Sequence, residues 1–382
     1  MLAAILITSG STILTSCSSE DDPVTPPTDE VEAQLQRMTL REKVGQLFYV
    51  RPECLDTTIH FNQPSSVDGS TDDIRAIKLQ AVNETMRGVN EKYPVGGVIL
   101  YAHNIEDEAQ LKAFIAQIRA LGGSPLLCID EEGGRVARIA NNGNFAVEKF
   151  ESMAAIGATG DAQNAYHCGN TIGTYLRRYG FDIDFAPVAD VNTNPENIVI
   201  GARAFSDNPE VAAPMVVSYL QELKDAGVTG CIKHFPGHGD TKADTHFGYA
   251  QSLKTWDEML SWGAQLIMTA HIVTPNVTGS DIPATMSSII LQDKLRGELG
   301  YRNIIITDAM EMGAITQQYT NAEAAVGTLL AGADIVLGPQ NFVDAFDAVI
   351  KAVEDGMLTE ERINQSVRRI LKMKTVNNMS NN

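Results

Sequence analysis

The segment 231–250, CIKHFPGHGDTKADTHFGYA, contains three histidines, two lysines and two aspartates. Asp244 and His246 are two positions apart, and in an extended chain such residues point the same way. A carboxylate beside an imidazole fixes its tautomer and stabilises its charged form. Because a histidine held in this way can donate and accept a proton near neutral pH, the pair is a candidate general acid–base.

Two other chemistries fit this segment less well. His234 and His238 have the spacing of two metal ligands on one helix face. However, Pro236, Gly237 and Gly239 make a helix improbable here, and no further Cys- or His-rich stretch completes a ligand set. The glycine-containing stretch PGHGDT also lacks the lysine that follows the last glycine of a phosphate-binding loop, and no helix start follows it. The sequence therefore predicts no metal and no cofactor, and it leaves His238 with a role in shaping the loop.

Eight short apolar runs alternate with amphipathic stretches from about residue 33, and they are typical of buried parallel strands. The runs are 46–50, 96–102, 125–130, 181–188, 230–235, 265–271, 303–309 and 333–338. The clearest helical stretches are 107–121, 209–226 and 359–374. Eight strand–helix repeats predict a single α/β domain, a TIM (β/α)8 barrel without a C-terminal α/β sandwich domain. The polar segment 52–80 is expected to form a rim loop.

Ionisable residues follow or end five of the eight runs. They are Asp130, Asp190, the pair Lys233 and His234, His271, and Asp308. In a TIM barrel the active site lies at the carboxyl ends of the strands. A structural ion pair would explain any one of these residues, but burying all of them at one mouth is costly without a function. The pattern therefore predicts an active site at this end.

The amino terminus, MLAAILITSGSTILTSC, has a short apolar run that predicts an export signal rather than a transmembrane helix. The stretch LTSC resembles a bacterial lipoprotein box, although no Lys or Arg precedes the run. We interpret 1–17 as a signal peptide with Cys17 as the lipid anchor, 18–34 as a disordered tether and 35–377 as the barrel. This predicts a cell-envelope protein that contacts the membrane only through its anchor.

The composition excludes some partners. Acidic residues outnumber basic ones, 48 to 29, and the formal charge of −19 argues against nucleic-acid binding. Cys128 and Cys231 lie in apolar runs and are expected to be buried thiols, whereas Cys54 and Cys168 are free to pair. The sequence does not determine the oligomeric state, and a monomer is the simplest expectation.

Five motifs, in order and spanning about residues 35–375, resemble glycoside hydrolase family 3, and more narrowly its β-N-acetylglucosaminidase branch. They are MTLREKVGQLF (38–48), IDEEGGRVARI (129–139), GARAFSDNP (201–209), KHFPGHGDTKADTH (233–246) and ITDAMEMGAI (306–315). Relatives often have Gln where this chain has Glu131, and we expect that residue to point away from the sugar.

The resemblance implies a retaining mechanism in which Asp308 is the nucleophile, His246 is the acid–base and Asp244 orients it. A histidine then replaces one of the two carboxylates that retaining glycosidases usually carry. The resemblance also implies a set of sugar contacts, which are Asp130, Arg138, Arg203, Lys233 and His234.

The function implied is an exo-acting β-N-acetylglucosaminidase that trims peptidoglycan- or chitin-derived fragments. Two alternatives stay open. A phosphorylase fits because a neutral histidine repels an incoming phosphate less than a carboxylate does. A lipid-anchored carbohydrate-binding protein that has lost catalysis is the other, although the retained Asp308 and Asp244–His246 pair argue against it.

Overall fold

The computed structural model describes residues 28–59, 78–241, 256 and 263–379. The predictions for Cys17, Asp244 and His246 lie outside these residues.

Eight parallel strands form one sheet in the order β10-β1-β2-β3-β6-β7-β8-β9. Its edges meet, because the amides of Asp334 and Ile335 donate to the carbonyl of Ile305, and the amide of Thr307 donates to that of Ile335. The predicted barrel is therefore confirmed, and each of the eight apolar runs supplies one strand. The strands are β1 Phe48–Val50, β2 Gly97–Leu100, β3 Leu126–Ile129, β6 Ile183–Asp184, β7 Thr229–Phe235, β8 Leu266–Thr269, β9 Ile304–Thr307 and β10 Val336–Leu337.

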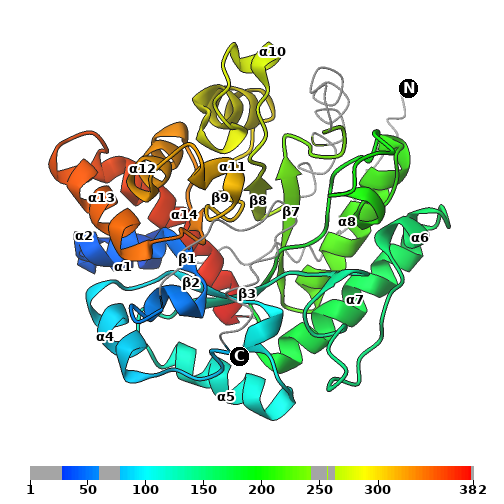
Figure 1. Cartoon of the computed structure of the whole chain (residues 1–382), viewed down its shortest axis with the longest axis horizontal. Helices are drawn as coiled ribbons and strands as arrows, with labels where there is room; N and C mark the ends of the chain where they lie inside the picture. The colour runs from blue at the N-terminus through cyan, green and yellow to red at the C-terminus, as the bar shows by residue number, and fades with distance from the viewer. Residues whose placement is uncertain (1–27, 60–77, 242–255, 257–262, 380–382) are drawn as a thin grey trace, which may run out of the picture.

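Helices surround the strands, as Figure 1 shows. The predicted helices at 107–121, 209–226 and 359–374 are found as α5, α8 and α14. The longer helices are α1 Thr28–Arg37, α4 Glu84–Lys92, α5 Glu108–Arg119, α7 Ala162–Tyr179, α8 Pro209–Asp225, the π-helical η5 Ile289–Glu298, α12 Asn321–Ala331, α13 Phe342–Glu354 and α14 Glu360–Met379.

Short elements complete the connections. The strands β4 Glu131–Gly133 and β5 Val136–Ala137 form an antiparallel hairpin directly after β3. The short helices are α2 Leu40–Gln46, α6 Met153–Gly157, α10 Pro275–Thr278, α11 Gly313–Thr316, η1 Pro52–Leu55, η2 Ala102–Asn104, η3 Gly201–Arg203 and η4 Ala284–Met286. The predicted rim segment 52–80 thus begins with η1, and residues 60–77 of it are not described.

Local sequence explains where the main helices begin. The side chain of Asn208 accepts from the amide of Glu210, and Pro209 occupies the first turn of α8, where its missing N–H costs nothing. The hydroxyl of Thr359 accepts from the amide of Arg362 at 3.1 Å, as expected from the Thr-Glu-Glu sequence that starts α14. These caps stabilise the helices that cover the barrel.

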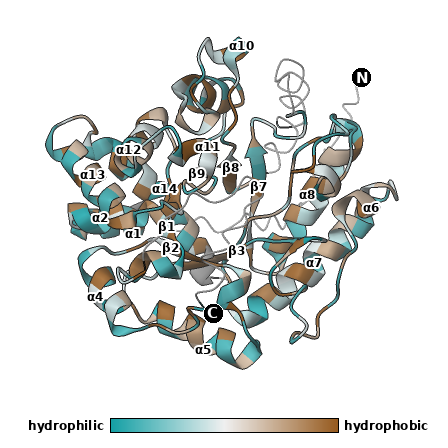
Figure 2. Ribbon diagram, in the orientation of Figure 1, coloured by the Kyte–Doolittle hydropathy of each residue, from teal (hydrophilic) through white to brown (hydrophobic). Residues whose placement is uncertain are grey.

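Alternate strand residues fill the barrel interior. On β3, β8 and β9 the inward-facing pairs include Cys128, Met268 and Ile306, and Ile370 and Met373 of α14 join the same buried cluster. The intervening residues face the helices and belong to the larger outer core. Figure 2 shows hydrophobic residues on β8, a hydrophilic end on β7, and both kinds of residue on the surrounding helices. This alternation is what turns strand-end residues toward a common mouth.

The structure differs from one predicted boundary, the end of the disordered tether at residue 34. Helix α1 begins at Thr28, so residues 28–34 of the predicted tether are helical. Val31 and Leu35 are buried, and Glu32 pairs with Arg368 of α14 at 2.8 Å. The sequence predicted this segment to be disordered. Burial of its apolar face against the barrel offsets the conformational entropy that the helix loses on ordering.

The four described cysteines are free, buried thiols. This confirms the expectation for Cys128 and Cys231, and it shows that Cys54 and Cys168 do not pair. Among the described residues, no helix has the length and hydrophobicity needed to span a membrane.

Candidate active site

The carboxyl ends of β3 and β7 carry a buried ion pair. Asp130 directly follows β3, and the ammonium Nζ of Lys233 lies 2.8 Å from its Oδ1. The same Nζ is 2.5 Å from Oε1 of Glu132. The side chain of Lys233 is 3% exposed, so its charge depends on these two carboxylates.

Two arginines extend this pair into a network. Arg203, at the end of η3, donates from Nε and Nη2 to Glu132 at 2.8 and 2.7 Å, a bidentate arrangement. Arg138 lies 3.4 Å from Oδ2 of Asp130, with its guanidinium 5.8 Å from the ring centroid of Tyr101. We call Asp130, Glu132, Arg138, Arg203 and Lys233 the carboxyl-end cluster.

The cluster keeps its members charged. Burial raises the pKa of Glu132, but Arg203 and Lys233 outweigh it and the pKa falls well below its usual value. For Asp130, Lys233 and Arg138 likewise outweigh burial and lower the pKa. Burial lowers the pKa of Lys233, but the two carboxylates reverse the shift. The site therefore presents fixed charges suited to hydrogen bonding hydroxyl groups.

Four of the five predicted sugar contacts thus lie in one network, and the residue that joins them was missed. Glu132 bridges Lys233 and Arg203, which are 30 positions apart in the chain. The only signal was its place two residues after Asp130 in the same motif.

The fifth predicted contact, His234, has a different partner. Its ring Nδ1 lies 2.7 Å from Oδ2 of Asp190, a fully buried carboxylate in the loop after β6. Oδ1 of Asp190 accepts from the backbone N–H of His238 at 2.6 Å. Burial raises the pKa of Asp190, but His234 and His238 outweigh it and hold the pKa low. Asp190, in the loop after β6, therefore orients the ring of His234.

The predicted nucleophile, Asp308, directly follows β9 and is half-buried. Its amide donates to the carbonyl of Thr269, and its own Oδ1 accepts from the amide of Ala309 at 2.7 Å. The ring Nε2 of His271 donates to the carbonyl of Ala309 at 3.0 Å, while Nδ1 contacts the hydroxyl of Thr285. Burial lowers the pKa of His271, and its neutral ring holds the peptide between Ala309 and Met310, one residue beyond Asp308.

Glu131 faces away from this site, as expected. Its carboxylate accepts from the amides of Arg138, Ile139 and Ala140 at 2.5, 2.9 and 2.8 Å, and from the hydroxyl of Tyr175 at 2.8 Å. These bonds partly offset burial, which raises the pKa of the carboxyl group. Glu131 therefore shapes the hairpin that places Asp130 and Arg138.

A second ion pair lies beyond Asp308. Arg51, which follows β1, contacts Oε2 of Glu311 at 2.7 Å, and both side chains are nearly buried. Beside them, Glu53 accepts from Asn104 at 2.6 Å and contacts the ring of His103 at 3.0 Å. No sequence pattern pointed to these residues, because their partners lie far away along the chain.

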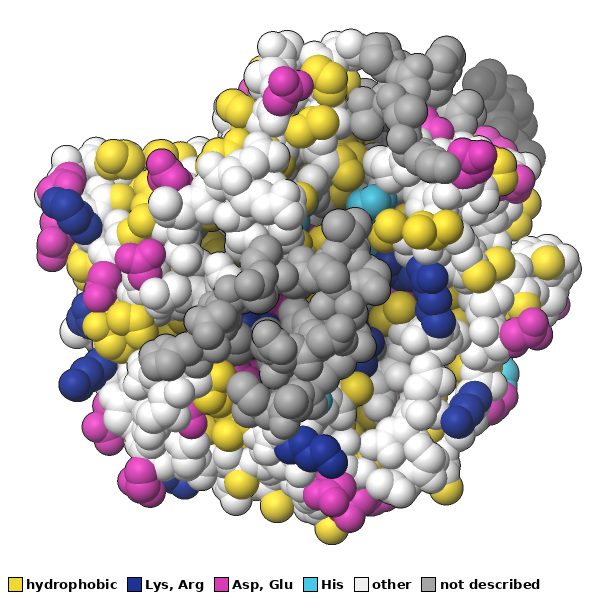
Figure 3. Space-filling view, viewed as in Figure 1, with side chains coloured by type: hydrophobic (Ala, Val, Ile, Leu, Met, Phe, Trp, Pro, Cys, Tyr) yellow, Lys and Arg dark blue, Asp and Glu magenta, His cyan; other side chains and the backbone are white. Residues whose placement is uncertain are grey.

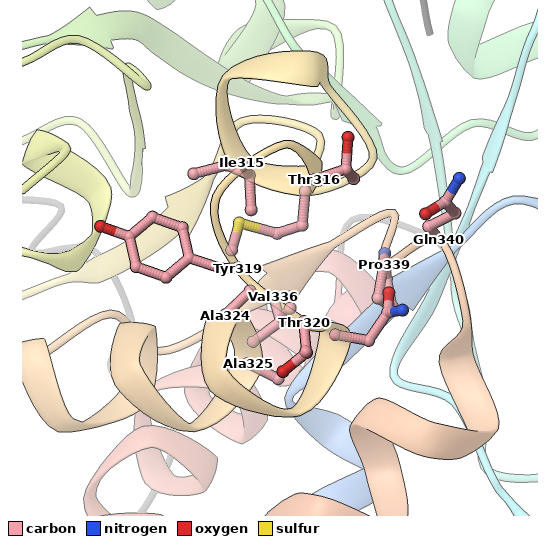
Figure 4. Close-up of a pocket in the computed structure, with 11 residues that line it drawn as sticks. Ile315, Thr316, Tyr319, Thr320, Ala324, Ala325, Val336, Pro339 and Gln340 are labelled. Atoms are coloured by element: carbon pink, nitrogen blue, oxygen red, sulfur yellow. The ribbon is translucent and has the colours of Figure 1, made fainter. Parts of the chain in front are cut away.

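In the part of the chain that the structure describes, two pockets near the ends of β9 and β10 and beside η1 do not include the carboxyl-end cluster. Figure 4 shows the smaller one, of about 10 Å³, which has room for about one water molecule. Its labelled residues are Ile315, Thr316, Tyr319, Thr320, Ala324, Ala325, Val336, Pro339 and Gln340. The larger hollow, of about 530 Å³, lies between η1 and the start of α13. Figure 3 shows acidic side chains mostly around the perimeter of the face viewed in Figure 1.

The described residues contain no cluster of three or more His, Cys, Asp or Glu that could hold a metal ion. The predicted acid–base residues Asp244 and His246 lie in 242–255, which the structure does not describe.

Comparison with known proteins places the whole barrel in one family. Residues 39–373 match the glycosyl hydrolase family 3 N-terminal domain. A beta-hexosaminidase A of Pseudoalteromonas piscicida is 34% identical over 324 residues, which cover 74% of this chain and 54% of that protein. The chain thus spans about half of that relative. A beta-hexosaminidase of Xanthomonas campestris pv. campestris is 35% identical over 272 residues, covering 67% of this chain and 81% of the relative.

A solved structure shows the same fold. The family 3 beta-N-acetylglucosaminidase of Paenibacillus sp. superposes with a TM-score of 0.76 and 34% identity. The match covers 90% of this chain and 63% of that one.

Proposed function

The chain belongs to glycoside hydrolase family 3, and on that premise we propose that it is a retaining, exo-acting β-N-acetylglucosaminidase. Its substrates would be peptidoglycan- or chitin-derived fragments with a terminal β-linked N-acetylglucosamine. The observation that carries the proposal is the set of ionisable groups at the carboxyl ends of β3, β7 and β9, with Asp308 on the last of these. The names of the relatives support the choice of sugar.

In the first step, a carboxylate oxygen of Asp308 attacks the anomeric carbon while the bond to the leaving oxygen breaks. The imidazolium of His246 transfers its proton to that oxygen, and Asp244 stabilises the charged ring. The product is a glycosyl ester on Asp308 and a free acceptor alcohol.

In the second step, neutral His246 takes a proton from water, and the resulting nucleophile attacks the anomeric carbon from the opposite side. The ester bond breaks, Asp308 is released as a carboxylate, and the sugar leaves with its original β configuration. Water and the chain's own residues supply every proton and electron pair, so the proposal needs no cofactor.

The carboxyl-end cluster would hold the terminal sugar during both steps. Asp130 accepts hydrogen bonds from hydroxyl groups, while Arg138, Arg203 and Lys233 donate them, and His234 contributes Nε2 of its ring. Because each of these bonds has a charged or oriented partner, the sugar is held with the anomeric carbon near Asp308.

Release of a chromophore from an aryl β-N-acetylglucosaminide tests the activity. We expect Asp308→Asn to lower kcat by at least about 1,000-fold, because the amide is a poor nucleophile. The matched control is Asp293→Asn, which changes an exposed aspartate of η5 and should leave turnover unchanged. Full activity of Asp308→Asn would contradict the nucleophile assignment.

The same assay separates the two alternatives. Turnover that requires phosphate and yields a sugar 1-phosphate would indicate a phosphorylase. Binding of N-acetylglucosamine without cleavage, by wild-type protein, would indicate a carbohydrate-binding protein. Hydrolysis to free N-acetylglucosamine at the same rate with and without phosphate is the outcome that the proposal predicts.

We also propose that Cys17 anchors the protein in the bacterial cell envelope. The lipoprotein-like LTSC stretch supports this proposal. Incorporation of labelled palmitate in bacteria producing the full chain, and its loss in Cys17→Ser, is the expected result. Equal labelling of the two proteins would contradict it.

A further inference from the structure

We propose that Asp190 is a positioning residue that ties the sugar-binding histidine His234 to the turn 236–241, which leads into the acid–base segment. This inference rests on the proposed function, because it assigns Asp190 a part in the same reaction. Asp190 itself touches neither the sugar nor the reacting atoms.

The geometry shows one carboxylate shared by two histidines. Oδ2 of Asp190 lies 2.7 Å from Nδ1 of His234 and also accepts from the backbone N–H of that residue at 3.3 Å. Oδ1 accepts from the backbone N–H of His238 at 2.6 Å. Asp190 is 1% exposed, so water does not compete for these bonds. A displacement of Asp190 would therefore move both the histidine ring and the start of the turn.

Side chains of the loop after β6 hold the turn in the same place. Nδ2 of Asn197 donates to the carbonyl of His238 at 2.7 Å. The hydroxyl of Thr193 donates to Oδ1 of Asp240 at 3.0 Å. Because these residues lie three to seven positions after Asp190, one loop contacts the turn at several points.

The backbones of the loop and the turn are also in direct contact. The amide of Asn194 donates to the carbonyl of Gly239 at 3.3 Å. A Cβ atom at Gly239 would lie 1.9 Å from the carbonyl oxygen of Val191, so only glycine permits this approach. The loop also ends in Arg203 of the carboxyl-end cluster. The sugar-binding residues and the turn thus share one support.

The pairing also fixes the chemistry of His234. Since the carboxylate of Asp190 accepts the proton on Nδ1, Nε2 is the ring nitrogen left to meet a sugar hydroxyl. An asparagine has nearly the same shape but only one acceptor oxygen. It would keep one of the two contacts, with His234 or with His238, and place an N–H group against the donor of the other.

The test compares two leaving groups in the full chain carrying Asp190→Asn. A dinitrophenyl N-acetylglucosaminide needs little acid assistance, whereas diacetylchitobiose needs a proton on the leaving oxygen. We expect kcat/KM to fall by about 100-fold with diacetylchitobiose, the cost of a misplacement of about 1 Å, and by about 10-fold with the dinitrophenyl substrate. Asp207→Asn, at an exposed position of the neighbouring loop, is the matched control and should behave as wild type.

A purely structural role would lower both rates by the same factor, and that result would overturn the inference, as would unchanged rates with both substrates. Thermal unfolding of each variant shows whether it is folded. Should Asp190→Asn not fold, Asn197→Ala releases the carbonyl of His238 without touching His234, and the same leaving-group difference is expected. Absence of turnover by wild-type protein would instead refute the proposed function.

Discussion

The barrel has a group of charges at each end. The two groups differ in how much of the hydrogen-bonding capacity of their aspartate the protein itself fills. The carboxyl-end cluster surrounds Asp130. At the amino end, Asp334 precedes β10 and binds arginines from η5 and α14. We call this second group the amino-end cluster, consisting of Asp334, Arg296, Arg362 and Arg369.

Asp334 has its hydrogen-bonding capacity filled by the protein. It accepts from Arg296 at 2.7 Å, Arg369 at 2.8 Å, Ser366 at 2.5 Å and the amide of Ile305 at 3.0 Å. These four donors match the four lone-pair sites of a carboxylate, and the side chain is fully buried. The amino-end cluster therefore joins η5, α14 and β9 and has no capacity left for a ligand.

Asp130 is 16% exposed, and the described residues give it two side-chain donors, Lys233 and a long contact from Arg138. These two donors leave lone pairs of its carboxylate unoccupied. The two aspartates are thus distinguished by unused hydrogen-bonding capacity. Substitutions at the two ends should therefore separate stability from activity.

The largest effect on stability is expected at Asp334. Asp334→Asn leaves three arginines without their carboxylate, and loss of one partner from a buried ion pair costs about 3–5 kcal/mol. Urea unfolding should show this loss, while kcat/KM of the folded protein stays unchanged. A variant that is stable but inactive would remove the distinction between the two clusters.

At the carboxyl end, Asp130→Asn should have the opposite result, with lower activity and nearly unchanged stability. Lys233 keeps Glu132 as a partner, so the free energy of unfolding changes little. Loss of charge-assisted bonds to the sugar, each worth about 1.5–3 kcal/mol, should lower kcat/KM by about 10- to 100-fold. Steady-state kinetics and urea unfolding measure both quantities. A loss of stability as large as that of Asp334→Asn, with normal kinetics, would contradict a sugar-binding role.

The sequence identified the barrel because its strands are uninterrupted apolar runs, and it identified the mouth because Asp130, Asp190 and Asp308 lie at or after the carboxyl ends of such runs. Asp334 also borders a run, but it comes before the strand, and this places it at the opposite end. Position relative to the strand therefore carried the functional signal, whereas residue type alone did not.

The sequence could not supply contacts between distant segments. Glu132 joins Lys233 to Arg203, and Arg51 meets Glu311, only because the closed sheet brings their strands together. The expectation that His238 shapes its loop is confirmed by its contacts with Asp190 and Thr241. The tether was predicted to extend too far because the partner surface of α1 lies on α14, at the other end of the chain.

A pH dependence of stability is also predicted at the amino end. Lys374 of α14 is nearly buried, and its side-chain nitrogen Nζ donates to the carbonyl of Ser124 at 2.8 Å. Burial lowers its pKa from 10.5 to about 7. Between these values the unfolded chain binds a proton that the folded protein does not. Stability conferred by this residue should therefore rise with pH from about 7 to 10.5 and be constant below that range.

Lys374→Met isolates this contribution. The difference in the free energy of unfolding between wild type and variant should change by up to about 1.4 kcal/mol per pH unit across this range. Urea unfolding at pH 7, 8 and 9 measures it, with kcat/KM as the control that should not change. A difference independent of pH would contradict the buried neutral amine.

The most direct test of the account is to identify the atom that carries the sugar. A fluorinated N-acetylglucosaminyl fluoride forms the glycosyl-enzyme quickly. Because this glycosyl-enzyme hydrolyses slowly, it can be trapped by acid quenching. Peptide mass spectrometry should then find one sugar unit on Asp308, at the carboxyl end of β9. A sugar on another residue, or none in an enzyme that turns over this compound, would contradict the mechanism.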